Sequence, residues 1–201
     1  RQEYILREVN LHNRVLTSDL SEAINVSEDT IRRDLVELSE TGKIIKAHGG
    51  ALSKSFHTSF QINGVYSHDK KKCIAQKAVN LIQDGMFILS GGGTTITELA
   101  KALPQQLQAT FFTGSLPAAI EYIQHPTAEV IFIGDRVSKN SRITIGGDAI
   151  QKITQINADI CFLGINALDP ELGLTDNDWE VVQIKKAMIK ASRKVVALTI
   201  S

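Results

Sequence analysis

Hydrophobic positions in the first fifty residues recur at helical spacing and predict two short helices at the start of the chain. The positions expected to face inward are Tyr4, Ile5, Val9, Leu20, Ala23 and Ile24. Thr17 precedes the second group and is the expected N-cap of the second helix, because its hydroxyl can accept a free backbone N–H.

The apolar stripe of a third helix follows at once, formed by Ile31, Leu35 and Leu38. Ser27 is its expected N-cap, and Gly42 is expected to end it. Two short extended segments come next, residues 43–46 and 47–52. They predict a small two-stranded wing.

From Asp69 onward, short apolar runs alternate with helical patterns. The expected strands are residues 86–90, 109–113, 129–134, 158–164 and 194–200. The expected helices are residues 74–82, residues 95–103, a helix starting near Ser115, and residues 178–192. Apolar strands separated by helices indicate a mostly parallel sheet that is buried on both faces. The fold class is therefore α/β.

The change of pattern divides the chain into two domains and a joint. Residues 1–52 form the expected winged helix-turn-helix domain, residues 53–68 a linker, and residues 69–201 an α/β domain. The segment SKSFHTSF within the joint shows no sustained period, which favours a linker.

Composition excludes several functional classes. The 201 residues are 43% hydrophobic, with 22 basic and 22 acidic side chains. No apolar run reaches the roughly 20 residues of a membrane span, and residues 1–20 lack the apolar block of a signal peptide. Cys161 is expected to be a buried thiol, and the histidines show no ligand spacing. We expect a cytoplasmic protein without a membrane segment, a metal or a cofactor.

Two helices joined by a tight turn have the geometry that fits the DNA major groove. Residues 1–50 contain seven basic and nine acidic residues, so a DNA-binding hypothesis depends on where the charges lie. The expected DNA-binding residues are Ser27, Glu28, Thr30, Arg32, Arg33, Lys43, Lys46, His48, Gly49 and Gly50. The alternative is a protein-docking module, in which the two arginines belong to a solvated face.

The stretch SGGGTT places glycines and hydroxyls between a strand and a helix, a geometry that suits an anion. Two further strand ends and a lysine on a late helix are expected to join it at the edge of the sheet. The expected effector-binding residues are Gly91, Gly92, Gly93, Thr94, Thr95, Thr113, Gly114, Ser115, Gly164, Asn166 and Lys185. A tight structural turn and a solvated Lys185 are the alternatives.

The segment VSEDTIRRDLVELSETGKIIKAHGGA resembles the signature of the DeoR family of bacterial transcriptional regulators. The resemblance covers nearly the whole chain. It implies a winged helix-turn-helix followed by a sugar-phosphate sensor similar to the ribose-5-phosphate isomerase fold, with the Gly-Thr-Thr loop holding the phosphate. Gly91 stands where the family has Asp, and Gly114 where it has Asn. The family also continues beyond Ser201 toward an Asp and a Lys, so part of the pocket is expected outside this sequence.

Together with this resemblance, the patterns predict a DNA-binding regulator, and the resemblance implies a repressor of a carbohydrate-use operon controlled by a phosphorylated sugar. It is expected to bind a double-stranded operator as a homodimer or homotetramer. The alternative is a sugar-phosphate isomerase with an accessory winged helix. That enzyme needs a general base, and GINAL holds no carboxylate before Asp169. A pure interaction module would leave the polar strand ends unexplained.

Overall fold

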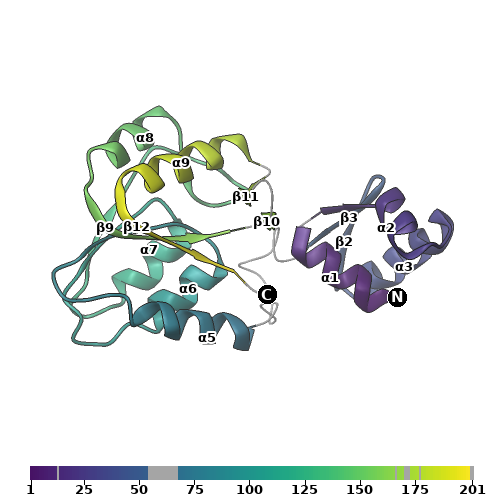
Figure 1. The fold of residues 1–201 in the computed structure, drawn as a ribbon, viewed down its shortest axis with the longest axis horizontal. Coiled ribbons are helices and arrows are strands. Elements are labelled where there is room, and N and C mark those ends of the chain that lie inside the picture. Colours follow the sequence, from purple (N-terminus) through teal and green to yellow (C-terminus); the bar gives the residue numbers. More distant parts are fainter. Residues whose placement is uncertain (13, 54–67, 166, 170–172, 177, 200–201) are drawn as a thin grey trace. The chain divides into compact units, whose positions relative to one another are not determined.

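The computed structural model describes residues 1–12, 14–53, 68–165, 167–169, 173–176 and 178–199. The chain divides into two compact units, residues 1–66 and 67–201, shown in Figure 1. Most of the predicted linker, residues 53–68, lies outside the described residues, as does Asn166.

The first unit is a three-helix winged fold. Its elements are α1 (Gln2–His12), β1 (Arg14–Leu16), α2 (Thr17–Ile24), α3 (Glu28–Glu40), β2 (Ile44–Ala47) and β3 (Gly50–Ser53). One hydrophobic cluster, which includes Ile5, Val9, Ile31, Leu35 and Leu38, joins the helices to the sheet. The three predicted helices and the β2–β3 hairpin are confirmed.

The structure corrects three details of this unit. The wing has three antiparallel strands in the order β1-β3-β2, and β1 was not predicted. Leu16, not Thr17, occupies the N-cap position of α2, and Thr17 is buried within the helix. Ala23, predicted to face inward, is exposed.

Gly42 ends α3 as predicted. Its φ is 71°, in the left-handed region that glycine adopts at low cost. The N–H of Lys43 then donates to the carbonyl of Leu38 (2.8 Å) and satisfies one of the last free carbonyls of the helix.

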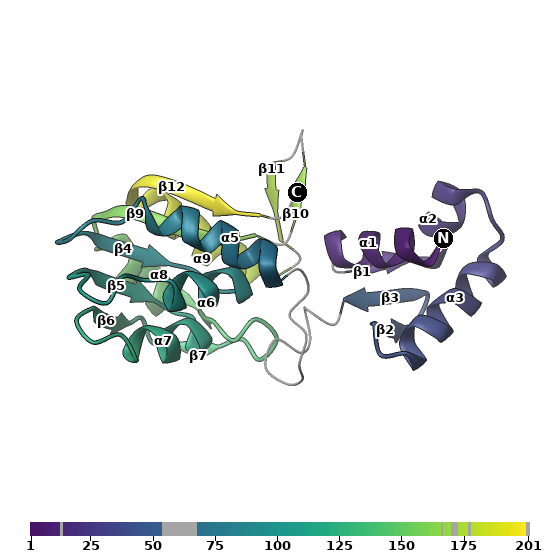
Figure 2. The same ribbon diagram turned by 90° about the horizontal axis from the view of Figure 1, so that it is seen from below.

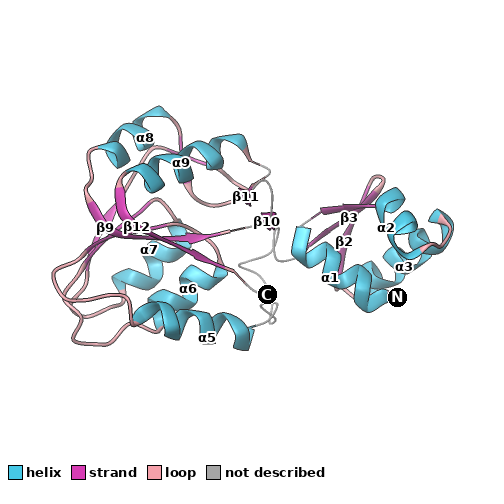
Figure 3. Cartoon of the chain, viewed as in Figure 1, coloured by secondary structure: helices cyan, strands magenta, loops and turns pink. Residues whose placement is uncertain are grey.

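The second unit is a parallel sheet with helices on both faces (Figure 3). The sheet has the order β12-β9-β4-β5-β6, with every pairing parallel. Its strands are β4 (Phe87–Ser90), β5 (Thr110–Thr113), β6 (Glu129–Phe132), β9 (Ala158–Gly164) and β12 (Ser192–Leu198). Figure 2 shows β12 and β6 at opposite edges. The predicted strands and fold class are confirmed.

The helices divide between the two faces of the sheet. One face packs against α5 (His68–Val79), α6 (Thr94–Lys101) and α7 (Leu116–Ile123). The other packs against α8 (Gly147–Thr154) and α9 (Trp179–Lys190). Helix α8 was not predicted. Two small hairpins were also missed: β7 (Arg136–Val137) with β8 (Thr144–Ile145), and β10 (Ala167–Asp169) with β11 (Gly173–Thr175).

Candidate functional site

Helix α3 begins at the N-cap Ser27, as the sequence predicts. The Ser27 Oγ accepts from the N–H of Thr30 (3.4 Å) and lies 2.9 Å from the Thr30 hydroxyl oxygen. The side of α3 that carries Ile31 and Leu35 is buried, so the residues on the opposite side face solvent. A polar helix surface of this kind is what enters the DNA major groove in helix-turn-helix proteins.

The two adjacent arginines of α3 differ in their contacts. Arg32 donates to Glu28 (2.6 Å) and to Asp29 (2.7 Å), so its guanidinium is held against its own helix. Arg33 is exposed and, among the described residues, has neither a hydrogen bond nor an ion pair. The cation that α3 presents for an outside partner is therefore Arg33.

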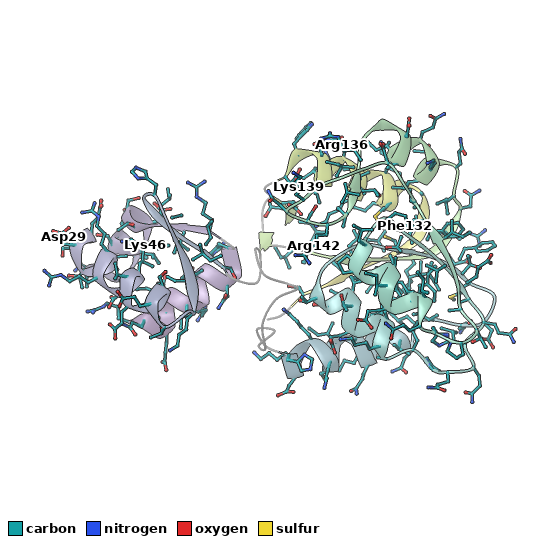
Figure 4. The ribbon with its side chains drawn as sticks, turned by 180° about the vertical axis from the view of Figure 1, so that it is seen from behind. Asp29, Lys46, Phe132, Arg136, Lys139 and Arg142 are labelled. Carbon is teal, nitrogen blue, oxygen red and sulfur yellow. The ribbon has the colours of Figure 1, made fainter. Side chains whose placement is uncertain are left out.

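The wing carries two further exposed cations and an exposed histidine. Lys43 follows α3, Lys46 lies in β2 and is labelled in Figure 4, and His48 lies in the turn between β2 and β3. Gly49 is exposed with φ 75°, and its carbonyl accepts from the N–H of Thr17 (2.8 Å). These residues all lie on the winged unit, where the sequence predicts them.

Gly50 has a different environment from the one predicted. It is buried, and a Cβ at this position would lie 1.9 Å from the carbonyl oxygen of Val15 in β1. The glycine is required because β1 and β3 approach closely, and its burial leaves it little surface for contact with DNA. Sequence reasoning missed this because it missed β1.

Sequence reasoning also missed Asp34, a buried carboxylate on α3. Asp34 accepts from two guanidinium nitrogens of Arg1, one of them at 2.9 Å, and from the Gln2 amide at 3.4 Å. The hydrogen bond from Arg1 lowers the pKa of Asp34. The contacts attach α3 to the start of α1. A charged residue immediately before the apolar Leu35 was the available signal.

A pocket opens at the carboxyl ends of β4 and β5, between the sheet and helices α8 and α9. It is lined by Leu89, Ser90, Gly91, Gly92, Phe112, Gly114, Ser115, Ile133, Ile143, Thr144, Ile153, Ile184, Lys185 and Met188. Five of the predicted effector residues are among them: Gly91, Gly92, Gly114, Ser115 and Lys185. Ligands of open parallel sheets bind at this edge.

The other predicted residues of the described chain do not line the pocket. Thr95 and Thr113 are buried, and Thr113 Oγ1 accepts from the N–H of Ser115 (3.1 Å). Thr94 is the first residue of α6, and Gly93 is its N-cap with φ 106°. A Cβ on Gly164 would lie 2.2 Å from the carbonyl oxygen of Gly92. Gly164 is therefore needed for packing against the glycine loop.

Gly114 lies against a residue that sequence reasoning missed. A Cβ at Gly114 would lie 2.2 Å from Thr144 Oγ1, so the Thr144 side chain fills the space next to the glycine. The Thr144 hydroxyl is buried and donates to the Ile133 carbonyl (2.7 Å). Gly114 and Thr144 come from different parts of the chain, and nothing in the sequence pairs them.

Lys185 brings a cation to the pocket, but the cation has a partner. Its Nζ donates to Asp176 Oδ2 at 2.7 Å, and the Asp176 side chain is only 5% exposed. Asp178, two residues later, caps α9 by accepting from the N–H groups of Glu180 and Val181. Asp176 was not predicted, because its contact depends on how the segment before α9 packs.

Ser90 forms a buried polar contact at the end of β4. Its hydroxyl lies 2.8 Å from the Tyr122 hydroxyl, and burial raises the pKa of Tyr122.

Cys161 is fully buried as predicted, and burial raises the pKa of its thiol to about 12. Across the described residues, no group of three or more His, Cys, Asp and Glu side chains could hold a metal ion. No helix in the described ranges is both long and apolar enough to span a bilayer.

Comparison with known proteins assigns both units. Residues 1–56 match the DeoR-like helix-turn-helix domain, and residues 66–200 match the DeoR C terminal sensor domain. The chain is 33% identical to the HTH-type transcriptional regulator GolR of Listeria innocua, over 98% of this chain and 79% of that protein. It is 31% identical to the HTH-type transcriptional repressor GlcR of Bacillus subtilis, over 96% of this chain and 76% of that protein.

Similarity extends to other regulators and to solved structures. The chain is 32% identical to the glycerol-3-phosphate regulon repressor of Haemophilus influenzae, over 98% of this chain and 77% of that protein. A structure of ribose 5-phosphate isomerase A from Methanocaldococcus jannaschii aligns with 66% of this chain and 52% of its own, at 20% identity and a TM-score of 0.47. With both its units matched and its fold observed, the chain belongs to the DeoR family of transcriptional regulators.

Proposed function

We propose that this regulator is a repressor of a carbohydrate-use operon and that a phosphorylated sugar in the pocket controls its binding to duplex DNA. One observation carries the proposal: the chain joins a winged unit with exposed cations to a second unit whose pocket is lined by glycines, hydroxyls and a lysine. The relative named as a glycerol-3-phosphate regulon repressor supports a phosphate-bearing effector.

The proposed DNA contacts are Ser27, Thr30, Arg33, Lys43, Lys46, His48 and Gly49. Arg33 is the candidate for a base contact, since arginine pairs in bidentate fashion with guanine in the major groove. The wing residues are suited to phosphates, which position the protein without reading sequence. Arg32 and Glu28 can contribute only if their ion pair opens on binding, and Gly50 is left out because it is buried.

The proposed phosphate site lies between the glycine loop and Lys185. The backbone N–H groups at Gly92 and Gly93 precede α6, and a helix N-terminus favours an anion. Lys185 faces the same pocket, and its ion pair with Asp176 holds the ammonium in place. The hydroxyls of Ser115 and Thr144 are the proposed contacts to the rest of the ligand.

A sensor is favoured over an isomerase. Sugar isomerisation needs a general base beside the substrate carbon. Of the described residues that line the pocket, none is a carboxylate or a histidine. We therefore infer that the protein is not an enzyme. We also infer that it acts as a homodimer or homotetramer in the cytoplasm, where its DNA target lies.

The test begins by selecting bound duplexes from a random pool with the full chain. Affinity for the selected duplex is then measured by fluorescence anisotropy with and without a panel of sugar phosphates. We expect sequence-specific binding that one sugar phosphate relieves and its unphosphorylated parent does not. Equal effects of the sugar with and without phosphate would contradict the phosphate site, and turnover of ribose 5-phosphate would favour the enzyme.

A further inference from the structure

The second unit has an exposed apolar face at one edge of its sheet. Helix α7 carries Leu116, Ile120 and Ile123 at the spacing of one helical stripe, and these are 40%, 55% and 68% exposed. Strand β6 adds Phe132, which is 41% exposed and points to the same side of the sheet as Val130, the side that α7 covers. These four residues form what we call the α7–β6 face.

The four residues are neighbours in space. Helix α7 buries Ala118, Ala119 and Tyr122 against the sheet and contacts β6. On the α6 side, Glu121 approaches Lys101, so the exposed stripe turns away from α6, toward the sheet edge. Figure 2 shows α7 beside the edge strand β6, and Figure 4 shows Phe132 next to the same helix.

Strand β6 also leaves its outer edge unpaired, because among the described strands it pairs only with β5. Monomeric proteins commonly carry lysines or other charges on such edges, which disfavour pairing with a strand of another chain. The opposite edge strand, β12, carries Arg193 and Lys194, both exposed. Strand β6 has the sequence EVIF, whose only charge is Glu129 at its start. The two edges therefore differ, and the edge at β6 is the one suited to association.

The size of the α7–β6 face fits a homodimer. The four side chains leave uncovered roughly the surface of two large residues, on the order of 400 Å² at ~200 Å² each. A standard interface buries about 800 Å² per partner, of which roughly 65% is apolar in homodimers, or about 500 Å². The chain has equal numbers of acidic and basic residues, 22 of each, so two copies do not repel one another through net charge.

We propose that the α7–β6 face is the surface through which two copies of this chain associate, about a two-fold axis that runs beside β6. The α7 stripes of the two copies pack together, and the two β6 edges face each other in antiparallel orientation. A two-fold interface brings the same patch of both subunits together, so the α7 stripe and the β6 edge of one copy meet the same elements of the other. The assignment concerns the sensor unit and depends neither on the DNA sequence nor on the ligand.

This surface is connected to the pocket through the same two elements. Ser115, the N-cap of α7, lines the pocket, and so does Ile133, the residue that follows β6. A ligand that moved the start of α7 or the end of β6 would therefore act on elements that form the interface. Coupling of this kind requires the ligand to bind the two arrangements with different affinity.

The test measures the mass of the full chain in solution by sedimentation velocity, without DNA or ligand. We expect a species of at least twice the 22.0 kDa chain mass. Ile120→Glu and Phe132→Glu should each reduce the mass by half or more, with an unchanged far-UV circular dichroism spectrum because both side chains are exposed. Ile189→Glu is the matched control, since Ile189 is 40% exposed on α9, on the other side of the sheet, and should keep the wild-type mass.

A second measurement places the contact directly. With the exposed Cys73 changed to Ser, an Ile123→Cys variant treated with a short bismaleimide should form a covalent dimer, and Ile189→Cys should not. A monomeric wild-type chain would overturn the proposal. So would α7–β6 variants that keep the oligomeric mass, or cross-linking that is equal at both sites. None of these outcomes bears on DNA binding, so the proposed repressor function is tested separately.

Discussion

At the scale of single residues, partners decide which charges are available. Arg32 and Arg33 are adjacent and both exposed, yet Arg32 is held by Glu28 and Asp29. Lys185 and Lys186 are also adjacent, yet Lys185 lines the pocket and pairs with Asp176, whereas Lys186 lies over the ring of Trp179. Within each pair, substitution of one residue therefore serves as the control for substitution of the other.

Arg33→Ala is expected to weaken binding to the selected duplex by about 1–3 kcal/mol, the usual effect of losing a base contact. Arg32→Ala should have a smaller effect, because its guanidinium must first leave two carboxylates. Fluorescence anisotropy measures both, and thermal unfolding should be unchanged. Equal losses for the two variants would show that α3 is oriented differently on the DNA.

Lys185→Gln is expected to reduce affinity for the effector by about 1.5–3 kcal/mol, the range for a hydrogen bond to a charged group. DNA binding without effector should persist, because Lys185 lies in the other unit. Calorimetric titration with the active sugar phosphate gives the difference, and Lys186→Gln is the control. If the affinity did not change, the phosphate would have to lie elsewhere in the pocket.

At the scale of elements, close contacts between residues of distant segments hold helices and strands in position against one another. Thr144 in β8 fills the space beside Gly114, which follows β5, and bonds to the carbonyl that follows β6. Asp34 attaches α3 to the start of α1. Both contacts join elements that a linear pattern treats as separate.

Gly114→Ala is expected to lower the free energy of unfolding by about 1–3 kcal/mol, because the new Cβ collides with Thr144 Oγ1. In a Thr144→Ala background the same change should cost less, since the colliding oxygen is gone. Denaturant unfolding of the four proteins forms a double-mutant cycle. Strictly additive effects would mean that the backbone at Gly114 moves away from Thr144 and that the collision does not occur.

Asp34→Asn is expected to lower the thermal midpoint of the winged unit by several degrees at neutral pH. Because Arg1 lowers the folded-state pKa of Asp34, the carboxylate stabilises the fold above the unfolded pKa of about 4. This contribution is lost as the pH falls through the folded-state pKa. Calorimetric scans should therefore show the two proteins converging in acid, with the exposed Glu40→Gln as a control at each pH. A constant gap down to pH 2 would rule out the carboxylate as its cause.

At the scale of the whole molecule, DNA reading and effector sensing belong to two compact units. We expect regulation to depend on the assembly, because one winged helix contacts too few base pairs for useful specificity. The proposed interface on the sensor unit would supply the second copy. A ligand in the pocket would then act on DNA binding through the arrangement of the two copies.

A fragment of residues 1–53 tests this dependence, and it must include β3, since Gly50–Ser53 completes the three-stranded wing. It should bind the duplex only in the non-specific range, with Kd about 10⁻⁴–10⁻⁶ M at physiological salt, and should not respond to the effector. Anisotropy titrations of fragment and full chain at several salt concentrations give the comparison. A fragment as tight as the full chain would show that assembly is not what is regulated.

The sequence by itself determined the elements whose signals are local. Helical periodicity located α1, α2 and α3, apolar runs located the strands of the parallel sheet, and the glycine and hydroxyl pattern pointed to the edge of the sheet that carries the pocket. These features follow from spacing within a few residues. Such spacing can be read from the sequence without knowing which segments contact one another.

The tertiary structure alone decided which of those residues line the pocket and which serve packing. Gly50 and Gly164 are glycines because another backbone approaches them. Distant segments of the chain contribute Thr144, Asp176 and the apolar side chains that line the pocket. The short strand β1 exists because β3 pairs with it. Such contacts join residues far apart in the chain, and their energy depends on distances that no local pattern records.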